Sequence, residues 1–193
     1  MCLDRSKHES GRFTDDDGNV HEKNIETIAR LGISVGCGRL EDNRYCPSRH
    51  VTRAQMATFL IRALGKGQDD TRTASRFSDI PDGAWYLAYV EQLADLNIVR
   101  LRAGDTFRPS DPTTRSEMAV WMARAFDSVD GVAPQGVFTD VPSDAPYAGA
   151  AEGLLAAGVT RGCSADPPAY CPDDPVQRDQ MASFFARVLV NQD

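Results

Sequence analysis

Three arginines stand at the same place in a motif that the chain repeats, Arg-x-Gln/Glu-Met. The three copies are Arg53-Ala54-Gln55-Met56, Arg115-Ser116-Glu117-Met118 and Arg178-Asp179-Gln180-Met181. Each arginine falls in the first turn of an expected helix, where a positive charge opposes the helix dipole and costs about a few tenths of a kcal/mol. An acid beside the guanidinium would offset that cost, because arginine binds carboxylates through paired hydrogen bonds. The motif therefore predicts that an acid, external or internal, lies beside each arginine.

The position of Arg53 around its helix predicts where that acid would lie. An α-helix turns by about 100° per residue, which places Arg53 about 50° from the middle of the apolar stripe, at the edge of a packing groove. Free helix N–H groups beside the guanidinium would help to receive an external carboxylate. The alternative is an internal ion pair with an aspartate of a neighbouring repeat, Asp15, Asp79 or Asp140. The sequence physics leaves both interpretations open.

Two pairs of cysteines stand at matching places of the first and third repeats: Cys37 with Cys46, and Cys163 with Cys171. The second repeat has arginine at both places, Arg102 and Arg108. Joint presence or absence favours two disulfides over a zinc site, which would need four convergent ligands. Persistent disulfides indicate an oxidising compartment and hence export. We expect Cys2 to be a free thiol and, since no apolar segment opens the sequence, the chain to be a fragment of a longer exported protein.

No pattern for catalysis, metal or a cofactor is found. The histidines, His8, His21 and His50, have no serine or cysteine nucleophile with an acid in a motif-like context. The acidic run over residues 15–19 lacks the spacing of a calcium-binding EF-hand loop, and we interpret it as a solvated turn. We therefore expect a protein that is not an enzyme, with no catalytic residues, no metal and no cofactor.

The elements that must position the arginines form repeats of helix, loop and helix. The first helix of the first repeat is expected over residues 20–31, with Ile25, Ile28 and Leu31 on its apolar stripe. The second helix opens at a capping box, Thr52 with Gln55, and the second repeat has the same box. The apolar stripe of this second helix recurs in all three repeats, and it predicts that these side chains form the hydrophobic core. Trp85 stands at the start of the first helix of the second repeat, and we favour a helix-packing role for it.

The repeats span nearly the whole chain. After an extension over 1–12, we expect repeats with their linkers at 13–76, 77–137 and 138–193. A unit of about 60 residues is marginal alone, so the three units should share one body. The net charge of −7 argues against a nucleic-acid partner, which needs a basic face. The sequence has no apolar run long enough to span a bilayer, so membrane insertion is not expected.

The ordered motifs of the second repeat resemble a complete S-layer homology repeat. They are Phe77-Ser78-Asp79-Ile80-Pro81, Trp85, Asp105-Thr106-Phe107-Arg108-Pro109 and Thr114-Arg115-Ser116-Glu117-Met118. Phe138-Thr139-Asp140-Val141-Pro142 restarts the pattern, and the resemblance covers residues 13–193. The first and third repeats resemble the cysteine-bearing form of secreted actinobacterial proteins.

This resemblance implies a mainly α, pseudo-threefold domain of three repeats that anchors exported proteins to the cell wall, at an extracellular location. Grooves between repeats would bind secondary cell-wall polysaccharide, often through a pyruvylated sugar. The implied glycan-binding residues are Arg53, Arg115, Trp85, Gln55 and Glu117, with Arg178 as a lesser contributor. A further exported protein would be fused to or associated with the chain. The alternative is a module for protein–protein interaction or self-assembly of a surface protein.

Overall fold

The computed structural model describes residues 11–67, 71–102, 104–129 and 131–190, and the fold is mainly helical. The elements in chain order are α1 (Glu22–Arg30), the 3-10 turn η1 (Leu40–Asp42), α2 (Arg53–Ala63), α3 (Leu87–Asp95), α4 (Arg115–Ala125), the 3-10 turn η2 (Asp127–Val129), α5 (Ala148–Ala156), β1 (Ser164–Ala165), β2 (Pro168–Ala169) and α6 (Arg178–Val190). Strands β1 and β2 form a two-residue antiparallel hairpin. Within the described ranges, each helix is too short or too polar to cross a bilayer.

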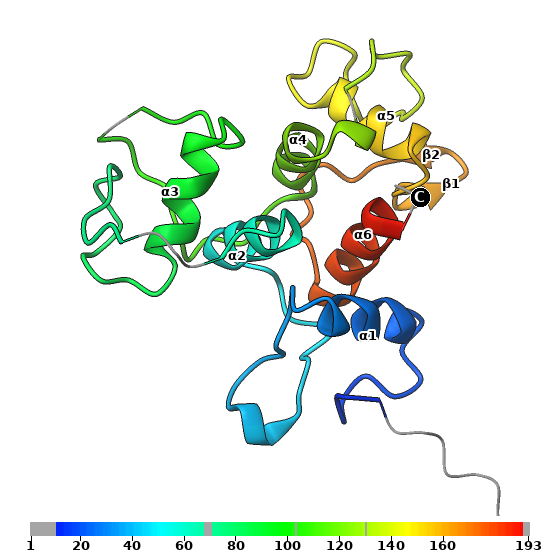
Figure 1. The fold of residues 1–193 in the computed structure, drawn as a ribbon. Helices are drawn as coiled ribbons and strands as arrows, with labels where there is room; N and C mark the ends of the chain where they lie inside the picture. Colours follow the sequence, from blue (N-terminus) through cyan, green and yellow to red (C-terminus); the bar gives the residue numbers. More distant parts are fainter. Residues whose placement is uncertain (1–10, 68–70, 103, 130, 191–193) are drawn as a thin grey trace, which may run out of the picture.

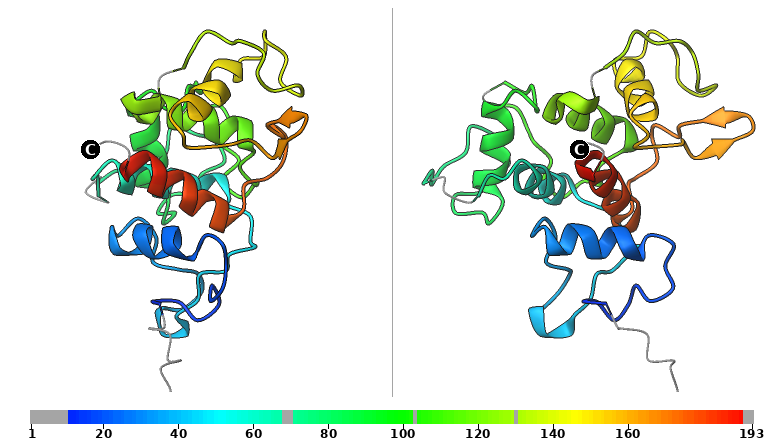
Figure 2. Two further views of the ribbon diagram at one scale, coloured as in Figure 1. Left: turned by 90° about the vertical axis from the view of Figure 1, so that its right-hand side faces the viewer. Right: turned by 45° about the vertical axis from the view of Figure 1, so that its right-hand side comes forward.

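The helices are arranged as a central group with three arms. Helices α2, α4 and α6 lie at the centre, while α1, α3 and α5 lie outside them (Figures 1 and 2). Helix α3 packs on α2, α5 packs on α4, and α1 packs on α6. Each outer helix thus packs on the central helix of the preceding repeat, and the third repeat closes on the first. The sequence repeats are therefore not the packing units.

A ring of backbone hydrogen bonds joins the segments that lead into the central helices. The Val51 N–H donates to the carbonyl of Val176 over 2.9 Å, Val176 donates to Thr113 over 2.9 Å, and Thr113 donates to Val51 over 2.8 Å. All three residues are fully buried. The ring gives the centre of the molecule its pseudo-threefold symmetry.

The starts of the central helices agree with the capping boxes predicted from the sequence. Thr52 accepts from the Gln55 N–H, and Thr114 accepts from the Glu117 N–H. The first N–H groups of the helices are not free, however. The Arg53 N–H donates to the Asp111 carbonyl over 2.9 Å, Arg115 donates to Asp174 over 3.0 Å, and Arg178 donates to Arg49 over 2.9 Å. The expectation of free helix N–H groups beside each arginine is wrong, because the loop of the next repeat supplies their acceptors.

The first repeat departs from its sequence interpretation at two places. Helix α1 begins at Glu22, and Leu31 is 53% exposed because it is the cap residue beyond the last turn. Asp16 is not in a solvated turn: it is 1% exposed, and neither carboxylate oxygen has a hydrogen-bond partner among the described residues. The second and third repeats have buried Ile80 and Val141 at this place, so the fold puts Asp16 at an apolar position.

Candidate functional site

The three motif arginines lie in the interfaces between repeats. Their exposed fractions are 5% for Arg53, 5% for Arg115 and 3% for Arg178. In each case the Nε–H donates over 2.7 Å to the carbonyl of an aromatic residue in the next repeat. These pairs are Arg53 with Phe107, Arg115 with Tyr170 and Arg178 with Tyr45. The arginines therefore connect the repeats around the whole ring.

Each guanidinium also lies over two aromatic rings of the next repeat. The Cζ of Arg178 is 4.6 Å from the ring centroid of Tyr45 and 5.6 Å from that of Phe59. Arg53 lies 4.9 Å from Phe107 and 5.0 Å from Trp121. Burial lowers the pKa of Arg53 and of Arg178, although an arginine in a protein keeps its charge. Cation–π contacts and the carbonyl together stabilise the buried charge.

The aspartates of the Phe-x-Asp motifs do not pair with these arginines. Asp15 accepts from the N–H groups of Tyr45 over 2.6 Å and Cys46 over 3.0 Å. Burial acts to raise the pKa of Asp15, but these hydrogen bonds and Arg44 outweigh burial and lower that pKa. Asp79 and Asp140 hold the equivalent loops in the same way. The internal ion pair with Asp15, Asp79 or Asp140 is thus wrong, since each aspartate fixes the loop whose carbonyl receives an arginine.

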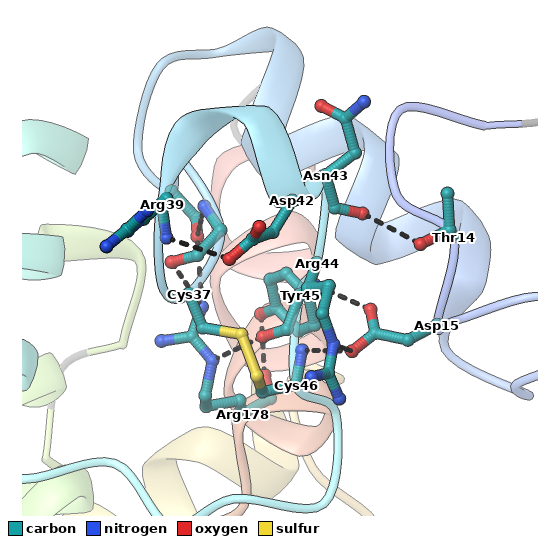
Figure 3. Close-up of a disulfide and its surroundings, with 12 residues drawn as sticks. Thr14, Asp15, Cys37, Arg39, Asp42, Asn43, Arg44, Tyr45, Cys46 and Arg178 are labelled. Atoms are coloured by element: carbon teal, nitrogen blue, oxygen red, sulfur yellow. Dashed lines mark hydrogen bonds and ion pairs between the residues drawn. A yellow bond between two sulfur atoms is a disulfide. The ribbon is translucent and has the colours of Figure 1, made fainter.

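Both predicted disulfides are present, Cys37–Cys46 and Cys163–Cys171, and Cys2 lies outside the described residues. Figure 3 shows Cys37–Cys46 beside Tyr45, Asp15 and Arg178. Because each disulfide takes up two thiols, the clusters that these cysteines form with Asp15 and Asp140 cannot offer thiolate ligands to a metal.

The first of two open grooves surrounds Arg178. This Arg178 groove is a cavity of about 260 Å³ lined by Val35, Gln55, Arg62, Trp85 and Arg178. Arg178 Nη2 donates to the Gly36 carbonyl over 3.0 Å, so its charge faces a neutral wall. Trp85 is 56% exposed and borders this cavity, so its ring is open to a ligand on one side. The groove combines a buried cation with an exposed aromatic face.

The second groove surrounds Arg115 at the interface of all three repeats. This Arg115 groove is a cavity of about 220 Å³ lined by His21, Arg115, Arg161, Gln180, Ser183 and Arg187. His21 Nδ1 lies 2.7 Å from Ser183 Oγ, which also accepts from the Asn24 amide over 2.7 Å. These partners lie about 160 residues apart in the sequence, so sequence reasoning missed the contact.

The surroundings of Arg53 differ from both grooves in having an acidic residue, Glu117. Glu117 forms an ion pair with Arg53 and lies 3.7 Å from Arg108. The equivalent residues are the neutral Gln55 beside Arg178 and Gln180 beside Arg115. Glu117 therefore compensates the charge of Arg53, while the arginines of the two grooves keep theirs. The sequence contained this signal, as a Glu at the third helical position of the second repeat alone.

Comparison with known proteins agrees with this architecture. Residues 76–119 match the family model of the S-layer homology domain. The surface-layer 125 kDa protein of Lysinibacillus sphaericus is 27% identical over 88% of this chain and 14% of its own length. The cellulosome-anchoring protein of Acetivibrio thermocellus is 29% identical over 61% of this chain and 27% of its own. The amylopullulanase of Thermoanaerobacterium thermosulfurigenes is 32% identical over 60% of this chain and 6% of its own.

The chain thus corresponds to a small part of each of these relatives, between 6% and 27% of their length. The chain carries an S-layer homology domain over residues 76–119, and its relatives support a location at the cell wall or cell surface.

Proposed function

From the S-layer homology domain in this chain, we propose that the module is non-catalytic and anchors to a cell-wall polysaccharide through the Arg178 and Arg115 grooves. Each groove would receive an acidic group of the polymer, such as a pyruvylated sugar. The observation that carries the proposal is a buried arginine that lines an open cavity beside a neutral glutamine. Holding a cation there is costly, and a ligand acid would offset the cost.

The proposal changes the order in which the three arginines were expected, from the sequence, to contribute to glycan binding. Arg53 and Arg115 were expected to lead, with Arg178 as a lesser contributor. The ion pair of Arg53 with Glu117 leaves less charge for a ligand, so Arg178 takes the place of Arg53. Asp179, the acid next to Arg178 in the sequence, accepts from the Asn19 side chain over 3.1 Å and from the Gln180 N–H over 2.7 Å.

Trp85 supports a sugar ligand at the Arg178 groove. Its exposed ring is 5.3 Å from the ring of Tyr86, in an edge-to-face arrangement, and borders the same cavity as Arg178. A sugar whose acid reaches Arg178 would stack a face on this indole. Two grooves on one rigid body would add their affinities through effective concentration, which matters for a chain that is acidic overall.

The test is binding to native cell wall before and after removal of its non-peptidoglycan polymer. The wild type should bind only the intact wall. The variant Gln55→Glu with Gln180→Glu copies the Glu117 arrangement, so it should pair both arginines, keep the capping boxes and lose wall binding. Losing one charge-assisted contact costs roughly 1.5–3 kcal/mol at each groove. Glu117→Gln is the matched control and should bind at least as well as the wild type.

A protein-docking module remains the second candidate, because one apolar hollow lies away from the grooves. It measures about 400 Å³ and is lined mainly by apolar side chains, among them Val132, Val137 and Leu155. Val132 is 39% exposed and Val137 is 41% exposed. Binding to wall that has lost the polymer, abolished by Val137→Asp and unaffected by Gln55→Glu with Gln180→Glu, would favour this candidate over the glycan.

A further inference from the structure

The three equivalent arginines differ in how well their terminal nitrogens are satisfied. Arg53 pairs with Glu117, and Arg178 Nη2 donates to the Gly36 carbonyl over 3.0 Å. Arg115 is only 5% exposed, and its Nη2 is buried without a hydrogen-bond partner among the described residues. A buried, charged donor without an acceptor is costly. The unpaired nitrogen is itself inaccessible to solvent, but its side chain lines an open cavity, so a small rotation of the guanidinium would let a ligand supply the missing acceptor.

The Arg115 groove also gathers more positive charge than the Arg178 groove. Arg161 and Arg187 line the same cavity as Arg115, and of the described residues that line it, none is acidic. Asp174 lines a neighbouring cavity that shares Arg115 and Gln180 with this groove. Arg187 Nη1 also donates to the Val159 carbonyl over 2.9 Å. In the Arg178 groove, Val35 occupies the place that Arg161 has in the Arg115 groove. Likewise, Trp85 occupies the place of His21. Three guanidinium groups thus reach one small cavity from α4, from the segment after α5 and from α6.

This arrangement distinguishes between classes of anion. A carboxylate carries one charge and two oxygens in a plane, which one arginine can bind in a bidentate manner. A phosphate monoester carries a charge of about −1.5 to −2 at neutral pH and three acceptor oxygens that diverge. Three arginines from three segments match the charge of the second class better than that of the first. The neutral Gln180 and the Ser183 hydroxyl add polar atoms without opposing charge.

We propose that the Arg115 groove is a site for a phosphate ester carried by the wall polymer, while the Arg178 groove takes the sugar-bearing part. The inference rests on the proposed function for the source of the ligand, and it goes beyond that function by making the two grooves chemically different. Arg115 Nη2 binds the phosphate from the buried side, and Arg161 and Arg187 bind it from the open side.

The experiment is a titration of the intact chain, followed by ¹H–¹⁵N NMR and calorimetry, with methyl phosphate, inorganic phosphate and acetate at equal ionic strength. Methyl phosphate should bind saturably, with shifts at Thr160–Gly162 and at the arginine Nε signals of the groove. It should bind at least about tenfold more tightly than acetate, as expected for a second charge-assisted contact. Equal binding of acetate, or binding of inorganic phosphate without methyl phosphate, overturns the proposal.

Matched variants assign the site. Gln180→Glu places a carboxylate beside Arg115, as Glu117 is placed beside Arg53, and should weaken methyl phosphate binding by about tenfold or more. Gln55→Glu makes the same change in the Arg178 groove and should leave methyl phosphate binding unchanged. Arg161→Val gives the groove the residue of its counterpart, at an exposed position that folding does not need. Unchanged phosphate affinity in both Gln180→Glu and Arg161→Val overturns the proposal.

The same proteins separate this inference from the proposed function. A wild type that binds intact wall but not methyl phosphate overturns the phosphate site and leaves wall anchoring in place. A wild type that binds methyl phosphate but not the wall overturns wall anchoring and supports the phosphate site.

Discussion

Arg178 and Tyr45 exchange two hydrogen bonds across the junction of the third and first repeats. The arginine Nε–H donates to the tyrosine carbonyl over 2.7 Å, and the tyrosine hydroxyl donates to the arginine carbonyl over 2.8 Å. Arg115 and Tyr170 repeat the arrangement over 2.7 Å and 2.9 Å. Each arginine therefore holds two repeats together and lines a groove with the same side chain. Its structural contacts and the proposed ligand contact are compatible.

The first prediction separates the two bonds of the pair. Tyr45→Phe removes the hydroxyl bond alone and reproduces the second repeat, where Phe107 stands at this place. It should lower the free energy of unfolding by about 1 kcal/mol. Arg178→Ala leaves the buried Tyr45 carbonyl and the partly buried Gly36 carbonyl without their donor and should cost more, about 3 kcal/mol. Urea unfolding followed by circular dichroism measures both changes.

Arg161→Ala is the control for these variants, since an exposed substitution should change stability by less than about 0.5 kcal/mol. A variant Arg178→Ala as stable as this control would mean that the arginine does not hold the repeats together.

The second prediction concerns the disulfide Cys37–Cys46. It closes a loop between residues nine apart. Tyr45 lies inside this loop and Gly36 directly precedes it, and the carbonyls of both accept from Arg178. Cys37→Ser with Cys46→Ser should lower the free energy of unfolding by about 2.5 kcal/mol through the unfolded state. It should also weaken ligand binding at the Arg178 groove more than at the Arg115 groove.

Calorimetric melting and wall binding of the double variant measure the two effects. The variant Cys163→Ser with Cys171→Ser is the matched control, and its loss of binding should fall on the Arg115 groove. If both double variants weaken the same groove, the disulfides do not act through the neighbouring carbonyls.

The sequence predicted the local features of this fold well. Capping boxes located the starts of α2 and α4, and the joint loss of Cys at Arg102 and Arg108 predicted the two disulfides. It could not predict the partner of each helix. Periodicity shows that one face of a helix is buried but does not show what covers it. The acceptors of the first helical N–H groups come from loops more than 50 residues away, beyond the reach of motif reasoning.

The third prediction follows from the packing of each outer helix on the central helix of the preceding repeat. A fragment of residues 77–137 holds one sequence repeat but loses α2, the partner of α3, and α5, the partner of α4. It should remain unfolded in water, whereas residues 11–190 should unfold in one cooperative transition. Circular dichroism of the fragment and calorimetry of the longer chain measure this. A folded fragment, or three separate transitions, would show that the repeats are independent units.

The last prediction concerns Asp16, which occupies a buried apolar position. Burial, followed by the nearby charge of Glu26, raises the pKa of Asp16 from 3.8 to about 6. As the pH rises from about 4 to about 6, the unfolded state loses this proton before the folded state does, so the contribution of Asp16 to stability falls across that window. Above about pH 6, the full free-energy cost of burying the charged Asp16 carboxylate is present. The lowered pKa values of Asp15 and Asp95 act below 3.8, outside this window.

Replacing Asp16 with Val, the residue of the third repeat at this place, should remove the penalty. Asp16→Val should raise the free energy of unfolding at pH 7 by about 1–3 kcal/mol, the cost of burying a polar group without a partner. It should also flatten the stability profile between pH 4 and pH 6. Urea unfolding across pH 4–7.5 measures both effects, with the exposed Asp17→Val as control. If Asp16→Val is less stable than the wild type at pH 7, the carboxylate has a stabilising partner and the burial argument is wrong.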